Sequence, residues 1–137
     1  DSASRGLGDV YKRQIPSPIC NAYYRLAGAK LGKGVQINTI NLNDPSAVTV
    51  GDNVVIGGRS VINGHLVEKG QLVLARVHLE KNCLIGAGTT IQPGVRIGEG
   101  AVIATNGLVG KWKEIPAGEV WGGLPVKLIS KSSDRKA

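Results

Sequence analysis

Two histidines are the side chains of this 137-residue chain best suited to proton transfer near neutral pH. An unperturbed imidazole has a pKa of about 6.5, so it can accept and release a proton in that range. His65 is the stronger candidate, because it opens the segment GHLVEKGQLVLARV, where the chain leaves an otherwise regular repeat. Loops that leave a rigid scaffold commonly carry function. A polar surface or subunit-contact histidine is the alternative interpretation.

The same excursion contains two further candidate residues. Glu68 lies three residues on and could orient the imidazole or stabilise its protonated form, with a solvated loop carboxylate as the alternative. His78 lies where the chain returns to the repeat, and we expect it to face solvent. A catalytic zinc normally takes three protein ligands. The two histidines are well separated in the sequence and no Cys or His cluster accompanies them, so we predict no metal site.

A second group of candidate residues lies near the end of the repeat. Lys111, Trp112 and Lys113 are consecutive, and Trp121 follows them. We expect the three consecutive residues to break the last regular coil. Aromatic residues there could form a cap that seals the open end of a solenoid. No glycine-rich nucleotide-binding motif is present, because the glycines occur at regular turn positions.

The elements that must position these residues are short strands. A large aliphatic residue recurs every six positions, whereas a half-buried strand has a period of two and a helix a period of 3.6. Small or β-branched residues follow four places later. A period of six indicates a hexapeptide β-helix, in which three short parallel strands and three turns make a coil of about 18 residues. The recurring residues are Leu79, Ile85, Ile91, Ile97, Ile103, Val109 and Ile115, with Val50, Ile56 and Ile62 upstream.

We therefore predict an all-β fold, a parallel β-helix of about four to five coils with short terminal caps. The competing fold is an alternating β-sandwich, which would need longer runs of period two, and these are scarce. One coil cannot bury enough apolar surface alone, so a short prism is expected to self-associate. The predicted divisions are a non-native or disordered tail (1–14), an N-terminal cap (15–30), the β-helix (31–129) with a loop excursion near 63–78, and a disordered basic tail (130–137).

Composition excludes several classes of function. The net charge is +7, but between Ile15 and Val126 ten basic residues outnumber the acidic ones by only three. No extended stretch interleaves basic and aromatic residues and no nucleic-acid motif is visible, so we predict no nucleic-acid partner. Cys20 and Cys83 form no disulfide framework, and we expect Cys83 to pack in the core. No run of eighteen apolar residues is present, so no membrane span is predicted within this chain.

The repeated units of an aliphatic residue, glycine and a small residue resemble the bacterial hexapeptide-repeat transferases. The resemblance covers about residues 25–129 and implies a left-handed helix, although the usual crossover rule favours the opposite hand. The order RLAGAKLGKGVQI, DPSAVTVGDNVVIGG, INGHLVEKGQLVL and LVGKWKEIPAG is similar to the C-terminal hexapeptide domains of poly-lysine-synthetase-type nonribosomal peptide synthetases and their stand-alone relatives. The turn Gly123-Leu124-Pro125-Val126 departs from the Gly-Asn-Pro-Ala-like turn of many such transferases.

The resemblance implies a function. It implies an acyltransferase with an acyl-coenzyme A co-substrate, a small-molecule acceptor, a homotrimeric assembly and His65 as general base. It also implies that the coenzyme passes near Lys111, Trp112, Lys113 and Trp121. Zinc-dependent carbonic anhydrases of the same fold use three histidines, which this chain lacks. The alternative is a non-catalytic trimerising module of a peptide synthetase or membrane-associated protein. We expect a cytoplasmic protein, with association at the inner face of a membrane through other parts of the full-length protein as the alternative.

Overall fold

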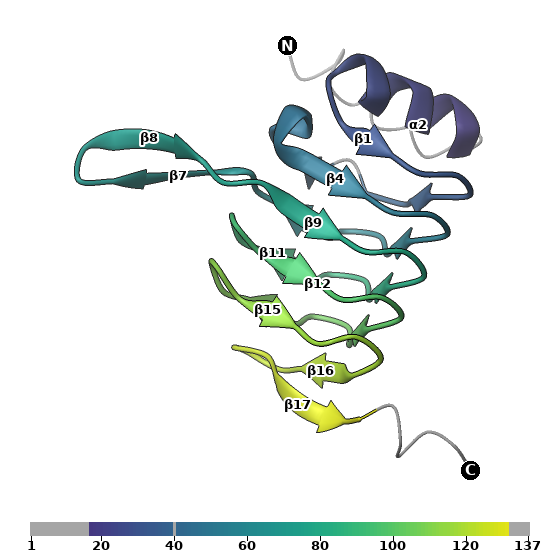
Figure 1. Ribbon diagram of the computed structural model, residues 1–137, viewed down its shortest axis with the longest axis vertical. Coiled ribbons are helices and arrows are strands. Elements are labelled where there is room, and N and C mark those ends of the chain that lie inside the picture. The colour runs from purple at the N-terminus through teal and green to yellow at the C-terminus, as the bar shows by residue number, and fades with distance from the viewer. Residues whose placement is uncertain (1–16, 40, 132–137) are drawn as a thin grey trace.

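The computed structural model describes residues 17–39 and 41–131, which form a three-sided prism of short strands (Figure 1). Within the three sheets of the prism, neighbouring strands are parallel, except that β17 pairs antiparallel with β16. The first sheet contains β1 (Lys30–Leu31), β4 (Val48–Val50), β9 (Val77–Leu79), β12 (Arg96–Ile97) and β15 (Glu114–Ile115). The second contains β2 (Gln36–Ile37), β5 (Val55–Ile56), β10 (Leu84–Ile85), β13 (Val102–Ile103), β16 (Val120–Gly122) and β17 (Lys127–Ser130). The third contains β3 (Asn41–Leu42), β6 (Val61–Ile62), β11 (Thr90–Ile91) and β14 (Leu108–Val109).

The chain visits the three sheets in turn, and each return to the first sheet adds a coil. In Figure 1 strands β9 and β12 lie at the front and run from left to right, while successive coils descend toward the C-terminus. The β-helix is therefore left-handed. The described strands make four complete coils and part of a fifth. The predicted fold, a left-handed parallel β-helix of four to five coils, is confirmed.

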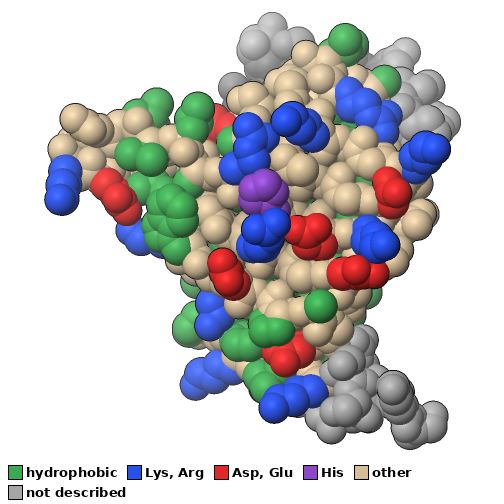
Figure 2. Space-filling view, in the orientation of Figure 1, with side chains coloured by type: hydrophobic (Ala, Val, Ile, Leu, Met, Phe, Trp, Pro, Cys, Tyr) green, Lys and Arg blue, Asp and Glu red, His purple; other side chains and the backbone are tan. Residues whose placement is uncertain are grey.

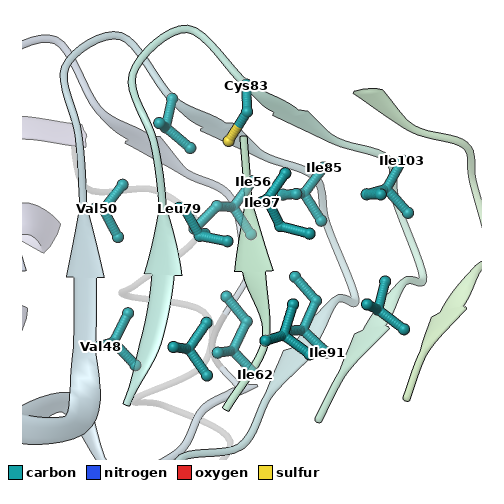
Figure 3. Close-up of a cluster of buried hydrophobic side chains, with 14 of the residues drawn as sticks. Val48, Val50, Ile56, Ile62, Leu79, Cys83, Ile85, Ile91, Ile97 and Ile103 are labelled. Carbon is teal, nitrogen blue, oxygen red and sulfur yellow. The ribbon is translucent and has the colours of Figure 1, made fainter. Parts of the chain in front are cut away.

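The aliphatic repeat forms the interior of the prism (Figure 3). The seven recurring residues from Leu79 to Ile115 are at most 2% exposed. Parallel pairing stacks each one on its counterpart in the next coil, as when Ile85 aligns with Ile103. Burial of such a side chain contributes about 1.5–3 kcal/mol. The small residues four places later are also buried: Val54, Ser60, Cys83, Thr89, Val95 and Ala101.

A helix covers the N-terminal end of the prism. Helix α2 (Ser17–Leu26) places Tyr24 against the core, where this side chain is 4% exposed. The Asn21 amide donates a hydrogen bond to the Val35 carbonyl at 2.6 Å, and the Tyr24 hydroxyl donates one to the Thr39 carbonyl at 3.1 Å. The helix thus covers the apolar interior at the first described coil. In the described part of the chain, no helix has the length and apolar character needed to cross a membrane.

Some expectations lie outside the described residues. They concern the tail at 1–14, the side chain of Cys20, and the basic tail from 132 onward. The last strand, β17, includes Ser130, so the described fold extends one residue into the segment expected to be a tail.

One edge of the prism departs from the regular turns. This edge, here called the hairpin edge, is where the chain passes from the third sheet to the first, and it comprises residues 43–47, 63–76, 92–95 and 110–113. The first of these segments, residues 43–47, contains a 3-10 turn, η1 (Pro45–Ala47). The second passage is much longer than the others. A coil of regular length would align Ile62 with Glu80, but Ile62 aligns with Ile91, so this passage contains an insertion.

Candidate active site

The inserted residues form a β-hairpin where a loop excursion was expected. Strand β7 (His65–Glu68) pairs antiparallel with β8 (Gln71–Leu74), and the hairpin projects away from the prism (Figure 1). Lys69 and Gly70 join the strands, with φ values of 50° and 76°. Two successive positive φ values match the right-handed twist of the flanking strands, which favours a two-residue hairpin turn. The chain rejoins the prism at β9, so the excursion is shorter than the predicted range of 63–78.

His65 lies at the root of this hairpin and contacts a carboxylate from the coil above. Its Nδ1 atom pairs with Oδ2 of Asp44, and the two side chains are 44% and 30% exposed. Asp44 precedes η1 and has left-handed backbone dihedrals, φ 55° and ψ 62°. Such a conformation is tolerated by Asp better than by most residues. The irregular turn therefore presents a carboxylate toward the imidazole.

Gly64 permits the close approach of these two segments. A Cβ atom at this position would lie 2.6 Å from the Ala47 Cβ and 3.2 Å from the Asp44 Cβ. The Gly64 carbonyl accepts a hydrogen bond from the N–H of Ala75 at 2.9 Å, which closes the base of the hairpin. Glycine at 64 thus lets His65 pack against the η1 turn.

The contact expected between Glu68 and His65 is not formed, because these residues lie at opposite ends of β7. Glu68 is near the tip of the hairpin and pairs instead with Lys111, with Oε1 and Nζ 3.8 Å apart. Both side chains are about half exposed, so this ion pair contributes little stability, about 0–1 kcal/mol. The ion pair nevertheless shows that the hairpin tip reaches the corner between the fourth and fifth coils.

Lys111, Trp112 and Lys113 do not break the coil, contrary to expectation. They form an ordinary corner before β15, and the Trp112 N–H donates to the Pro93 carbonyl at 3.0 Å. Trp112 has a φ of 64° at the position that Gly94 occupies one coil earlier. A bulky side chain in the left-handed region costs about 1–3 kcal/mol.

The side chain of Trp112 lies beneath Gly94 on the hairpin edge. A Cβ at Gly94 would lie within 2.8 Å of the indole, so the ring packs directly on this backbone. The indole is nevertheless 54% exposed. An aromatic surface is therefore available on the same edge as His65 and beside the Glu68–Lys111 ion pair.

Lys113 follows Trp112 on the hairpin edge, but its side chain extends to Trp121 at the C-terminal end of the prism. Trp121 aligns with Ile103, six residues after Ile115, and so occupies the next position of the aliphatic repeat. Its ring packs against the core, and its Nε1 donates to Glu119 at 3.0 Å. The Lys113 Nζ atom lies 4.6 Å from the ring centroid of Trp121. The structure therefore splits the four residues expected to bind the coenzyme into two separate pairs.

Other candidate residues are separate from the His65 contact. His78 projects outward from β9, and burial together with Arg96 and Arg76 lowers its pKa. Burial raises the pKa of Cys83 to about 12, so its thiol stays protonated and unreactive at neutral pH. Within residues 17–39 and 41–131, no group of three or more His, Cys, Asp or Glu is placed to hold a metal ion.

Asp44 is the functional candidate that sequence reasoning missed. It lies little more than one coil before His65, but the change of period in this region conceals the alignment. Ile37 aligns with Ile56, a spacing one residue longer than that of the regular coils. An Asp before Pro45 at the edge where the repeat is disturbed was the available signal.

Sequence comparisons find the same repeat. The pattern of the bacterial transferase hexapeptide (six repeats) matches residues 76–111, and that of the hexapeptide repeat of succinyl-transferase matches residues 47–70. A similar sequence occurs in delta-poly-L-ornithine synthetase of Acinetobacter baumannii, 29% identical over 82% of this chain and 8% of that protein. Another occurs in galactoside O-acetyltransferase of Escherichia coli, 31% identical over 77% of this chain and 55% of that protein. The chain thus spans less than two thirds of either relative.

The structural comparison agrees on the fold. A hexapeptide-repeat containing acetyltransferase from Vibrio cholerae superimposes with a TM-score of 0.70. It covers 95% of this chain and 89% of the other at 18% sequence identity. Similarity at this level shows a shared β-helix.

Proposed function

Because this chain belongs to the hexapeptide-repeat transferase family, we propose that it transfers an acyl group from acyl-coenzyme A to a small-molecule acceptor. The acceptor supplies a hydroxyl or an amine, and His65 acts as the general base. Acetyltransferase relatives support the class of reaction. We also propose that the protein acts in the cytoplasm, where its acyl-coenzyme A donor is found.

The observation that carries the proposal is the contact between Asp44 and His65. An ionised Asp44 accepts a hydrogen bond from Nδ1–H, which fixes the tautomer and leaves Nε2 as the proton acceptor. A carboxylate in this position also stabilises the imidazolium that forms during the reaction. Both side chains are partly exposed, so a substrate can reach them.

The proposed chemistry requires one base. The acceptor oxygen or nitrogen attacks the thioester carbonyl as Nε2 of His65 takes its proton. A new C–O or C–N bond forms, and collapse of the tetrahedral intermediate breaks the C–S bond. The imidazolium returns its proton to the departing thiolate, so His65 ends in its starting state.

We assign the coenzyme to the hairpin edge below His65. Trp112 offers an exposed aromatic surface that can cover the adenine or the pantetheine arm, and Lys111 can meet a phosphate. Trp121 continues the core, and Lys113 lies over its ring, so we assign this pair to the C-terminal cap. This revises the expectation that all four residues contact the coenzyme.

We propose that the active form is a homotrimer. In the hairpin, His65 is opposite Leu74 and Val67 is opposite Leu72, so these four residues share one face. The three aliphatic residues on that face are 63–69% exposed. An isolated two-stranded hairpin is at best marginally stable in water. Cover by a neighbouring copy would protect this face and enclose His65 at the subunit boundary.

A non-catalytic trimerising module is the second candidate. It is favoured by the similarity of 82% of this chain to only 8% of a long synthetase. Calorimetric titration with acetyl-coenzyme A separates the two candidates. Saturable binding is expected for the transferase, and absence of binding to the trimer would favour the module.

Single-turnover acyl transfer tests the role of His65. Wild type and His65→Ala are compared with a panel of hydroxyl and amine acceptors, at saturating acetyl-coenzyme A. We expect the substitution to slow transfer about 10²–10⁴-fold, the usual contribution of a general base. Thermal unfolding checks that the variant remains folded. Equal rates for the two proteins would remove His65 from the mechanism.

A further inference from the structure

The three faces of the prism differ in the charge of their outward residues. In the second sheet the aligned outward residues include Val55, Leu84, Val102 and Val120, and in the third they include Val61, Thr90 and Leu108. In the first sheet the aligned positions are Lys30, Thr49, His78, Arg96 and Glu114. Figure 2 shows the first sheet from outside, with a histidine among Lys and Arg side chains and with Asp and Glu side chains close by. Charge at these aligned positions is thus concentrated on one face.

Two arginines approach His78 from different elements. Pairing places His78 between Thr49 of β4 and Arg96 of β12. Arg76, two residues before His78, donates from Nη1 to the Thr49 hydroxyl at 3.2 Å, which holds its guanidinium beside β4. Strands of one sheet are about 4.8 Å apart, so Arg96 and the Thr49-bound guanidinium of Arg76 belong to the strands on either side of His78.

The acidic groups nearby compensate only part of this charge. Glu80 accepts hydrogen bonds from Nε and Nη2 of Arg96 at 3.3 and 3.1 Å. No ion pair to Arg76 occurs among the residues that the structure describes. Burial, Arg96 and Arg76 lower the pKa of His78, whereas Glu80 raises it. The positive potential at the imidazole therefore exceeds what Glu80 compensates.

We propose that Arg76, His78 and Arg96 form a binding site for a phosphate group. The planar guanidinium of Arg76 can hold two phosphate oxygens, and the adjacent imidazole and Arg96 provide donors for the remaining oxygen. The site is on the first sheet, beside the base of the hairpin, because Arg76 directly follows Ala75. Phosphate binding here does not depend on the proposed acyl transfer and is measured without an acyl donor.

An NMR titration of the His78 imidazole with inorganic phosphate tests the site. Signals of His78 are identified by their loss in His78→Gln. We expect millimolar phosphate to shift these signals saturably and to raise the pKa of His78, since a bound anion stabilises the imidazolium. Arg76→Gln should weaken binding about 10-fold or more, the effect of losing a charge-assisted hydrogen bond.

The matched control is Arg59→Gln, which removes an exposed arginine from a different edge of the prism. It should leave phosphate affinity unchanged. Equal weakening by the two substitutions, or no saturable shift of the His78 signals, would overturn the proposal. Coenzyme A and dephospho-coenzyme A then identify the source of the phosphate: a response to coenzyme A alone assigns its 3′-phosphate to the site, and no response to either assigns another phosphorylated ligand.

Discussion

The coils from β9 to β14 and the hairpin edge belong to the same prism but are constructed in different ways. In the coils every sixth residue is aliphatic and buried, and strands pair at a constant spacing along the sequence. At the edge, η1 and the hairpin interrupt that spacing and bring Asp44 against His65. The regular part gains stability from burial, whereas the interrupted part places polar side chains that the interior cannot accommodate. The residues proposed for acyl transfer therefore lie where the repeat is interrupted.

The largest predicted effect on stability is in the regular part. Ile91→Ala removes a side chain that is fully buried, so it should lower the free energy of unfolding by about 2–5 kcal/mol. Urea denaturation at a fixed protein concentration measures this effect. Thr90→Ala changes the outward residue next to it and should cost less than about 1 kcal/mol. Similar losses for both variants would contradict the inward orientation of the repeat.

A second prediction concerns the exposed face of the hairpin. Leu72→Lys puts a charge on the aliphatic face, so it should weaken trimerisation by about 1–3 kcal/mol, or roughly 5- to 150-fold. Gln71→Lys changes the neighbouring residue on the other face and should preserve the trimer. Sedimentation equilibrium distinguishes them. If Leu72→Lys remains as trimeric as wild type, the proposed interface is wrong.

A third prediction compares the two tryptophans. Trp112→Ala should weaken binding of acetyl-coenzyme A about 10-fold, because an aromatic stacking contact is worth about 1–3 kcal/mol. Trp121→Ala should instead lower the thermal unfolding temperature, since Trp121 packs on the core, and should largely preserve affinity. Calorimetry and thermal unfolding measure the two quantities. If only Trp121→Ala lost affinity for acetyl-coenzyme A, the coenzyme would instead contact the pair formed by Trp121 and Lys113.

The smallest effect is predicted for the ion pair at the hairpin tip. Lys111→Gln should lower stability by less than about 1 kcal/mol, because both partners are about half exposed and water screens them. Raising the salt concentration should remove even this difference from wild type. A loss of several kcal/mol in thermal or urea unfolding would show that the pair fixes the hairpin more strongly than its exposure implies.

The interior could be predicted from the sequence because each repeat gives the same signal. The same position of the repeat is occupied by Ile85, Ile91, Ile97 and Ile103. A single residue that departs from the pattern would therefore not hide the six-residue period. Trp121 could have been included, as it continues the same count, but its aromatic character suggested a ligand contact. The corner at Trp112 was misread because a bulky residue is unexpected where the backbone favours glycine.

The candidate site was less predictable because it depends on two irregular segments, the η1 turn and the hairpin. His65 was identified by its position at the break in the repeat, but its carboxylate partner was expected at Glu68. Sequence proximity favoured Glu68, whereas the three-dimensional path brings Asp44 from the preceding coil. A hairpin was not expected, because its alternating residues occur in two very short strands.

The most direct test of this account is the rate of single-turnover acyl transfer in Asp44→Asn. Its matched control is Asp52→Asn, which alters a carboxylate that accepts the Lys33 N–H at 2.8 Å on another edge. We predict that Asp44→Asn slows transfer by between about 10- and 10⁴-fold, because the imidazole loses its orienting charge, while Asp52→Asn retains the wild-type rate. Equal rates in wild type and both variants would show that the contact at the broken repeat does not serve catalysis.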